Sequence, residues 1–144
     1  MNDRILVDTN ILVYAYDLDA GEKRAKALEI VERLWDAGNG VLTTQVLAEF
    51  FVTITRRVKQ PLPLAEARQI IEDYQAEWVT FATTPETVLR AVDGVGQHGL
   101  SFWDAMIWAA AWLNGVSAIY SEDMQAGQII EGVRIENPLL SVTP

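Results

Sequence analysis

The sequence predicts an α/β domain of three layers, α/β/α, with a short-stranded, mostly parallel central sheet. Short apolar runs alternate with segments of helical periodicity along the chain. This alternation is typical of a parallel sheet that is covered by helices on both faces. The chain has 144 residues, half of them hydrophobic. That length and composition predict one domain, residues 1–144, with a single hydrophobic core.

The strands of the predicted sheet are short apolar runs. In chain order they are expected at residues 5–7, 41–43, 79–82, 118–121 and 133–135. A helical pattern follows the first strand directly and runs through Tyr16, and a loop is expected at residues 17–21. No repeat, linker or low-complexity segment interrupts the alternation.

The other helices are identified by apolar residues at a spacing of three or four. They are expected over residues 22–37, from Thr44 to the prolines at 61 and 63, over 64–78, from Thr84 to the glycines at 94, 96 and 99, and over 101–114. The buried stripe of the helix at 22–37 is expected to consist of Ala25, Leu28, Val31 and Trp35. The helix at 101–114 is the most apolar, and its tryptophans, Trp103, Trp108 and Trp112, are expected to pack in the core or at a dimer contact.

Composition excludes several classes of chemistry. The chain has no cysteine, which excludes disulfides, thiolate nucleophiles and cysteine metal sites. The single histidine, His98, is expected at the surface of a helix end, and neither a nucleophile elbow nor a P-loop is present. The start of the chain lacks the pattern of a secretion signal, and the most apolar run, residues 102–113, is too short to span a bilayer. A soluble cytoplasmic protein without a membrane partner is expected.

The net charge of −9 argues against a nucleic-acid partner, because phosphates must be neutralised by Lys and Arg. Local clusters differ from this average. One consists of Arg56, Arg57 and Lys59, and the other consists of Lys23, Arg24 and Lys26. Either cluster can be a solvated helix end, but the first is also the candidate for contact with an RNA backbone.

Two acids follow predicted strands. Asp8 comes at the carboxyl end of the first strand, and Asp123 comes two residues after the strand at 118–121. In an open parallel sheet, ligands bind at the carboxyl ends of the strands, so both acids are expected at one edge. The alternative is structural: Asp8 caps the helix that begins near Asn10, and Ser121 or Asp123 caps a short turn.

Two further acids lie in predicted helices. Asp104 is the only charged residue between Leu100 and Val116, on a helix whose apolar circumference predicts burial. A buried carboxylate must be paired, protonated or bound to a metal. The alternative is a capping box of Ser101 and Asp104. Glu49 lies off the apolar stripe of its helix, where a solvent-facing glutamate is the simplest interpretation.

Four carboxylates that converge on one edge would repel each other unless cations neutralise them. Oxygen-only ligand sets suit Mg²⁺ or Mn²⁺. Two such ions can activate water and stabilise the departing oxygen of a phosphodiester. Phosphodiester hydrolysis is therefore the reaction that this pattern favours.

The same residues resemble a known family. The chain is similar to the PIN-domain ribonucleases in the order of four motifs. These are D-T-N after the first strand, a Glu in the helix after the second, S-F-W-D-A at the head of the apolar helix and S-E-D-M after the next strand. The similarity is greatest to the VapC-type toxins of toxin–antitoxin pairs, and it covers the chain from Ile5 to about Pro138. A PIN-like fold is thereby implied.

The resemblance implies that an acidic quartet holds Mg²⁺ or Mn²⁺, with three polar residues in support. The acids are Asp8, Glu49, Asp104 and Asp123, and the supports are Thr9, Asn10 and Ser121. It also implies an endoribonuclease that is usually a homodimer and is inhibited by a VapB-type antitoxin whose tail occupies the acidic groove.

Some alternatives stay open on the sequence alone. Glu122 and Asp123 are adjacent, and Asp123 matches the position of the fourth acid better. In the expected mechanism, Asp8 and Asp104 hold the principal metal, while the other two acids hold a second ion or orient water. A non-toxin PIN-like RNA-processing or RNA-binding module, or a metal-dependent phosphatase, is the alternative function.

Overall fold

The computed structural model describes residues 3–140 and contains one six-stranded sheet. The strands are β1 (Ile5–Val7), β2 (Gly40–Thr43), β3 (Val79–Phe81), β4 (Ala118–Tyr120), β5 (Ile129–Ile130) and β6 (Val133–Glu136). Their order is β3-β2-β1-β4-β6-β5. All neighbouring strands are parallel except β5, which pairs antiparallel with β6.

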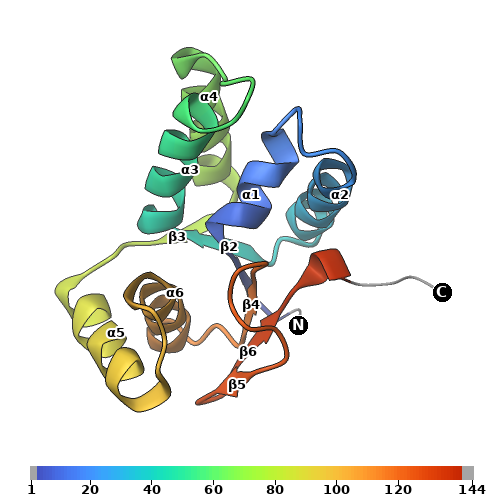
Figure 1. Ribbon diagram of the computed structural model, residues 1–144. Coiled ribbons are helices and arrows are strands. Elements are labelled where there is room, and N and C mark those ends of the chain that lie inside the picture. Colours follow the sequence, from blue (N-terminus) through green and yellow to red (C-terminus); the bar gives the residue numbers. More distant parts are fainter. Residues whose placement is uncertain (1–2, 141–144) are drawn as a thin grey trace.

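In the described part of the chain, six α-helices cover the sheet. They are α1 (Thr9–Tyr16), α2 (Glu22–Ala37), α3 (Thr44–Arg56), α4 (Leu64–Glu77), α5 (Pro85–His98) and α6 (Phe102–Leu113), and a 3₁₀ turn, η1 (Pro138–Leu140), follows β6. Helices α1 to α4 lie on one side of the sheet, and α5 and α6 lie on the other (Figure 1). The predicted three-layer α/β/α fold with a mostly parallel sheet is confirmed. Over residues 3–140, no helix is both long enough and apolar enough to cross a membrane.

The order of the strands reverses at β1. The chain runs outward from β1 through β2 to β3, and then returns to place β4 on the other side of β1. Right-handed crossovers put the helices of the two directions on opposite faces. The carboxyl ends of β1 and β4 therefore meet at a topological switch point, where open α/β sheets bind ligands. The amide of Asp8 donates to the carbonyl of Tyr120 there, at 2.9 Å.

The apolar helix α6 forms much of the core on its side of the sheet. Its residues 105–111 are buried, while its first and last turns reach the surface. Helix α5 packs against it through Gly94, where an added Cβ would lie 2.9 Å from the ring of Trp108. The expectation that Gly94 and Gly96 halt this helix was wrong, because α5 continues to His98 and ends at Gly99, whose φ of +67° closes it.

Two other expectations need correction. In α2 the buried residues are Ala27, Ile30, Val31 and Leu34, and the predicted Ala25 is exposed. The stripe is therefore rotated, with Leu28 and Trp35 at its margin. Strand β5 was not predicted, because it has two residues and its hairpin turn places Glu131 at a positive φ of 48°, where Asn or Asp is the usual signal.

Candidate active site

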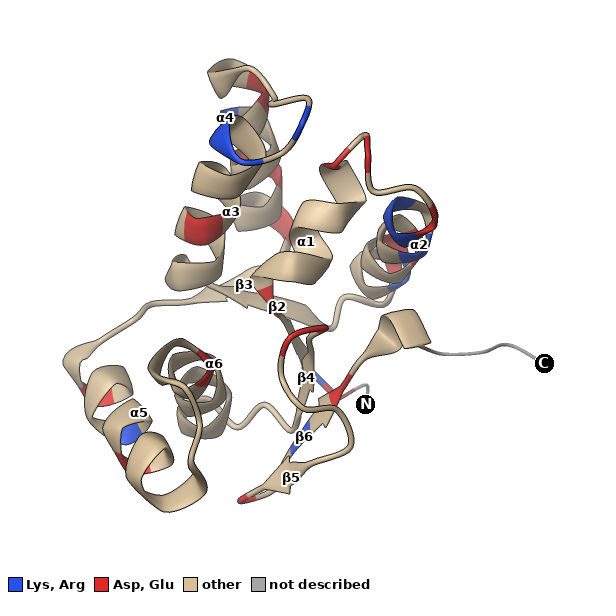
Figure 2. Cartoon of the chain, in the orientation of Figure 1, with Lys and Arg blue, Asp and Glu red and all other residues tan. Residues whose placement is uncertain are grey.

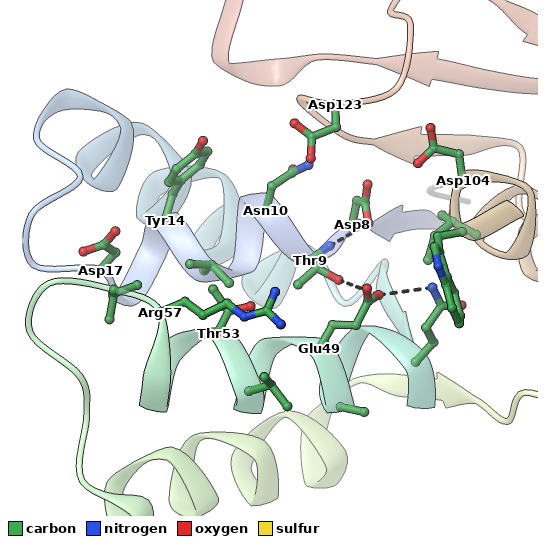
Figure 3. A pocket seen from close by; sticks show the side chains of 17 residues that line it. Asp8, Thr9, Asn10, Tyr14, Asp17, Glu49, Thr53, Arg57, Asp104 and Asp123 are labelled. Atoms are coloured by element: carbon green, nitrogen blue, oxygen red, sulfur yellow. Dashed lines mark hydrogen bonds between the residues drawn. The ribbon is translucent and has the colours of Figure 1, made fainter. Parts of the chain in front are cut away.

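A cavity of about 700 Å³ opens beside the switch point. Its walls are one face of α1, one face of α3 and the first turns of α6, and Asp123 from the loop after β4 also lines it. All four acids that the sequence singled out line this cavity: Asp8, Glu49, Asp104 and Asp123 (Figure 3). Side chains from four separate segments are thus brought together.

Asp8 is held at the base of the cavity by both of its oxygens. Oδ1 accepts a hydrogen bond from the amide of Thr9 at 2.7 Å, and Oδ2 accepts one from the hydroxyl of Ser121 at 2.7 Å. The residue is the N-cap of α1, with extended backbone angles, as the structural alternative expected. Capping and a place in the cavity are compatible, because a carboxylate oxygen has two lone pairs and each oxygen of Asp8 can accept a further partner.

Burial sets the protonation of Asp8. The side chain is 8% exposed, and desolvation is the main reason that its pKa rises to about 6. The hydrogen bonds from Ser121 and Thr9 act in the opposite direction, while the negative charges of Asp104 and Glu49 raise the pKa further. The pKa of Asp8 therefore responds to the charges of both other carboxyl groups across the cavity.

Glu49 is exposed, as its position off the apolar stripe predicted, but it also faces the cavity. Oε1 accepts a hydrogen bond from Gln45 Nε2 at 3.1 Å and one from the hydroxyl of Thr9 at 3.3 Å. Thr9 therefore connects the carboxylates of Asp8 and Glu49, through its amide on one side and its hydroxyl on the other (Figure 3).

Asp104 lies in the first turn of α6 and is only partly buried. The expectation of a fully buried carboxylate was wrong, because burial in this helix begins at residue 105. The hydroxyl oxygen of Ser101 caps the helix by accepting a hydrogen bond from the amide of Asp104 at 3.3 Å. This bond is one of the two that the predicted capping box would contain. Within residues 3–140, the carboxylate of Asp104 makes no hydrogen bond or ion pair, so it is directed into the cavity without a protein partner.

The two adjacent acids after β4 lie in different surroundings. Glu122 forms an ion pair with Lys23 at 2.8 Å and accepts a hydrogen bond from the hydroxyl of Tyr14. Asp123 is exposed and lines the cavity. Asn10 fixes this loop, because its Oδ1 accepts the amide of Glu122 at 3.1 Å.

The basic residues are divided in a similar way. Basic positions gather at the α3–α4 connection and on α2 (Figure 2). Of Arg56, Arg57 and Lys59, all exposed, only Arg57 lines the cavity. In the second cluster, Lys23 is paired with Glu122.

Sequence reasoning missed several residues of the cavity wall, among them Gln45 and Trp103. Gln45 could have been found, because it lies one helical turn before Glu49 and therefore on the same face of α3. Trp103 was expected in the core or at a dimer contact; it is not in the core, because it is 62% exposed, and it lines the cavity. Trp108 does pack in the core, while Trp112 is 41% exposed. His98 lies at the end of α5, as expected, and its Nε2 is 2.7 Å from Glu131.

The donor set of the cavity suits a hard cation. Within residues 3–140, no group of three or more His, Asp or Glu side chains is arranged so that it could hold a metal ion. Mg²⁺ commonly uses only one or two carboxylates and keeps several waters, which substrate phosphate oxygens can replace. A partnerless Asp104 near a desolvated Asp8 provides this smaller oxygen set. A cation there would also relieve the repulsion that raises the pKa of Asp8.

Comparison with known proteins gives a family and a set of folds. The model of the PIN domain family matches residues 5–129. No curated protein matches the chain. The structure is similar to VapC20 of Mycobacterium tuberculosis, a toxin that cleaves the sarcin-ricin loop, with a TM-score of 0.65 and 22% identity over 83% of this chain and 89% of that one.

Two solved complexes are similar as well. A toxin–antitoxin complex from Klebsiella pneumoniae has a TM-score of 0.66 and 21% identity, over 93% of this chain and 97% of that chain. The DNA-bound VapBC of Salmonella typhimurium has a TM-score of 0.66 and 15% identity, over 95% and 99%. At these identities the likeness shows a shared fold.

Proposed function

The chain belongs to the PIN domain family, and from that premise we propose that it is a metal-dependent endoribonuclease, the toxin of a VapBC-type toxin–antitoxin pair that acts in the cytoplasm. The observation that carries this proposal is the meeting of Asp8, Glu49, Asp104 and Asp123 in one cavity at the switch point. An acidic cavity of this kind suits phosphodiester hydrolysis, because cations held there neutralise phosphate charge.

Mg²⁺ or Mn²⁺ would be held by Asp8 and Asp104, with Glu49 and Asp123 binding a second ion or acting through water. When bound, the ion supplies activation of water and stabilisation of the oxygen that leaves phosphorus. Cutting is expected to leave a 5′-phosphate and a 3′-hydroxyl.

The supporting residues position the acids. Ser121 and Thr9 hold the two oxygens of Asp8, so one carboxylate orientation is maintained. The hydroxyl of Thr9 holds Glu49, and Asn10 holds the backbone of the loop that carries Asp123. Such outer hydrogen bonds commonly matter about 10- to 100-fold in metal affinity or activity.

The RNA backbone would be held near Arg57. This residue lines the cavity beside Thr53, which supports a role in phosphate contact (Figure 3). Arg56 and Lys59 are exposed and do not line the cavity. They would add positive charge along the path of the RNA strand. We further propose a homodimer, residues 1–144 as one domain, and an antitoxin whose tail enters the acidic cavity.

The test is metal-dependent cutting by the purified protein. RNA of mixed sequence and structure is incubated with Mn²⁺ or with EDTA, and fragments are read by sequencing of their 5′ ends. Internal cutting is expected in Mn²⁺ but not in EDTA. Asp8→Asn and Asp104→Asn should each abolish the cutting in Mn²⁺. Asp36→Asn, an exposed acid on α2, is the matched control and should cut normally. Undiminished cutting by the two site variants would contradict the assignment.

A further inference from the structure

Trp103 occupies an unusual position for so large an apolar side chain. It is 62% exposed, although the residues that follow from 105 to 111 are buried. Within the described residues its one aromatic neighbour is Phe102, whose ring meets it edge-on with centroids 5.2 Å apart. An exposed indole of this kind is available to cover another flat apolar surface.

The indole lies beside the acids. Trp103 immediately precedes Asp104 in the first turn of α6, and both side chains line the cavity. Ile107 lies one turn further along the same face and is almost fully buried in the wall. This side of the cavity therefore offers an apolar surface next to a carboxylate.

A second aromatic residue of the cavity is already engaged. Tyr14 also lines it, but the ammonium of Lys23 lies 4.9 Å from the centroid of its ring, and its hydroxyl donates to Glu122. Among the 17 residues that line the cavity, Tyr14 and Trp103 are the aromatic ones. Trp103 is thus the lining residue whose ring remains open to a ligand.

We propose that Trp103 is a substrate-positioning residue that stacks on a nucleobase next to the phosphate that is cut. This inference rests on the proposed ribonuclease function and adds how that site would hold its substrate. Contacts of Arg57 and of bound cations with phosphate would position the RNA backbone, but such contacts leave the neighbouring base unheld. An exposed aromatic face binds an unstacked base, and it does so with little dependence on sequence.

The first measurement is binding without cutting. A fluorescent 12-nucleotide single-stranded RNA is titrated with the protein in Ca²⁺, and anisotropy gives the Kd. Trp103→Ala is expected to weaken binding about 5- to 150-fold, the range for loss of one stacked base, and Trp103→Phe should restore most of it. Trp112→Ala, at the other end of α6 and outside the cavity lining, should bind as the wild type does.

The second measurement removes the base instead of the indole. A series of the same 12-mers carries one abasic nucleotide at each position in turn. For the wild type, one or two positions should lose affinity, whereas Trp103→Ala should lose nothing further at those positions. Such non-additivity is expected only if the indole and that base contact each other, and a purely structural role would not produce it.

The outcomes separate the two proposals. If the wild type binds and cuts RNA but Trp103→Ala does so equally well, stacking is overturned while the ribonuclease stands, and the indole serves a protein contact instead. Additive losses in the abasic series overturn stacking as well. If the wild type neither binds nor cuts any RNA, both proposals fail. Melting temperatures of all variants exclude unfolding as the cause.

Discussion

Ser121 donates its hydroxyl hydrogen to Oδ2 of Asp8 at 2.7 Å, across 113 positions of sequence. This bond joins the carboxyl ends of β1 and β4 at the switch point of the sheet. Both residues are buried, and the same Ser121 oxygen accepts the amide of Met124 at 3.2 Å. A single hydroxyl therefore fixes one acid of the cavity and the loop that carries another.

The pH dependence of stability should report the burial of Asp8. Its pKa is about 6 in the folded protein against the ordinary value of 3.8 for an aspartate in an unfolded chain, so the folded state binds more protons between these values. The free energy of unfolding therefore falls as pH rises from about 4 to 6, by about 3 kcal/mol from this group alone. Asp8→Asn removes that loss.

Urea denaturation in EDTA from pH 4 to 7 measures this effect. The difference in unfolding free energy, Asp8→Asn minus wild type, should increase with pH and then level off above about pH 7. Taking the difference cancels the titrating groups that do not interact with Asp8 and any constant effect of the altered cap. A difference that is flat across this range would show that Asp8 has an ordinary pKa.

Ser121→Ala should move the pH profile of RNA cutting to higher pH. The hydrogen bond from Ser121 lowers the pKa of Asp8, so its loss leaves the carboxyl protonated to a higher pH. Cutting rates from pH 5 to 9 give the acid limb. Ser117→Ala, at a half-buried residue outside the cavity lining, is the control and should keep the wild-type profile. If the acid side of the pH profile is unchanged in Ser121→Ala, the hydrogen bond from Ser121 does not influence RNA cutting through the pKa of Asp8.

The adjacent acids Glu122 and Asp123 should differ in their effect on cutting. Asp123→Asn should reduce the rate about 10-fold or more, because it removes a carboxylate from the cavity. Glu122→Gln should cost stability instead, through the weakened contacts with Lys23 and Tyr14. Cutting rates with melting temperatures separate the two effects. The reverse pattern would make Glu122 the fourth acid.

The packing of α5 on α6 should depend on Gly94. Gly94→Ala places a methyl group 2.9 Å from the ring of Trp108 and should destabilise the fold by about 1–3 kcal/mol. Gly96→Ala is the matched control in the same helix, where an added Cβ meets nothing within 4 Å. It should stabilise the fold by about 0.5–1 kcal/mol. Chemical denaturation measures both, and equal effects would argue against the tight contact.

Local signals in the sequence predicted most of the fold. The N-cap Thr84 with Pro85 marked the start of α5, and Asp8 after an apolar run marked the end of β1. Signals failed where the outcome depends on tertiary contacts. A glycine such as Gly94 usually indicates a helix end. Here it lies inside α5, because the ring of Trp108 leaves no room for a Cβ at this position. Ala25 and Ala27 are the same residue type near the same end of α2. Which of them is buried depends on the angle at which α2 packs, and the sequence does not show that angle.

The candidate site was predictable as a set of residues, but its details were not. The places of Asp8 and Asp123 followed from the rule that strand ends meet at one edge. Distant partners decided the rest: Lys23, which lies in α2, pairs with Glu122 and so separates it from Asp123. The exposure of Trp103 had no sequence signal either, because its helix is apolar throughout.

Calorimetric titration with Mn²⁺ tests most directly whether the four acids form a cation site. The wild type and Asp36→Asn should bind Mn²⁺ with equal affinity, and Asp8→Asn and Asp104→Asn should each lose at least about 10-fold. Melting curves in EDTA confirm that each variant is folded. Equal Mn²⁺ affinity in all four proteins would contradict the account. So would a wild type that binds no Mn²⁺ even when the titration is repeated in the presence of RNA.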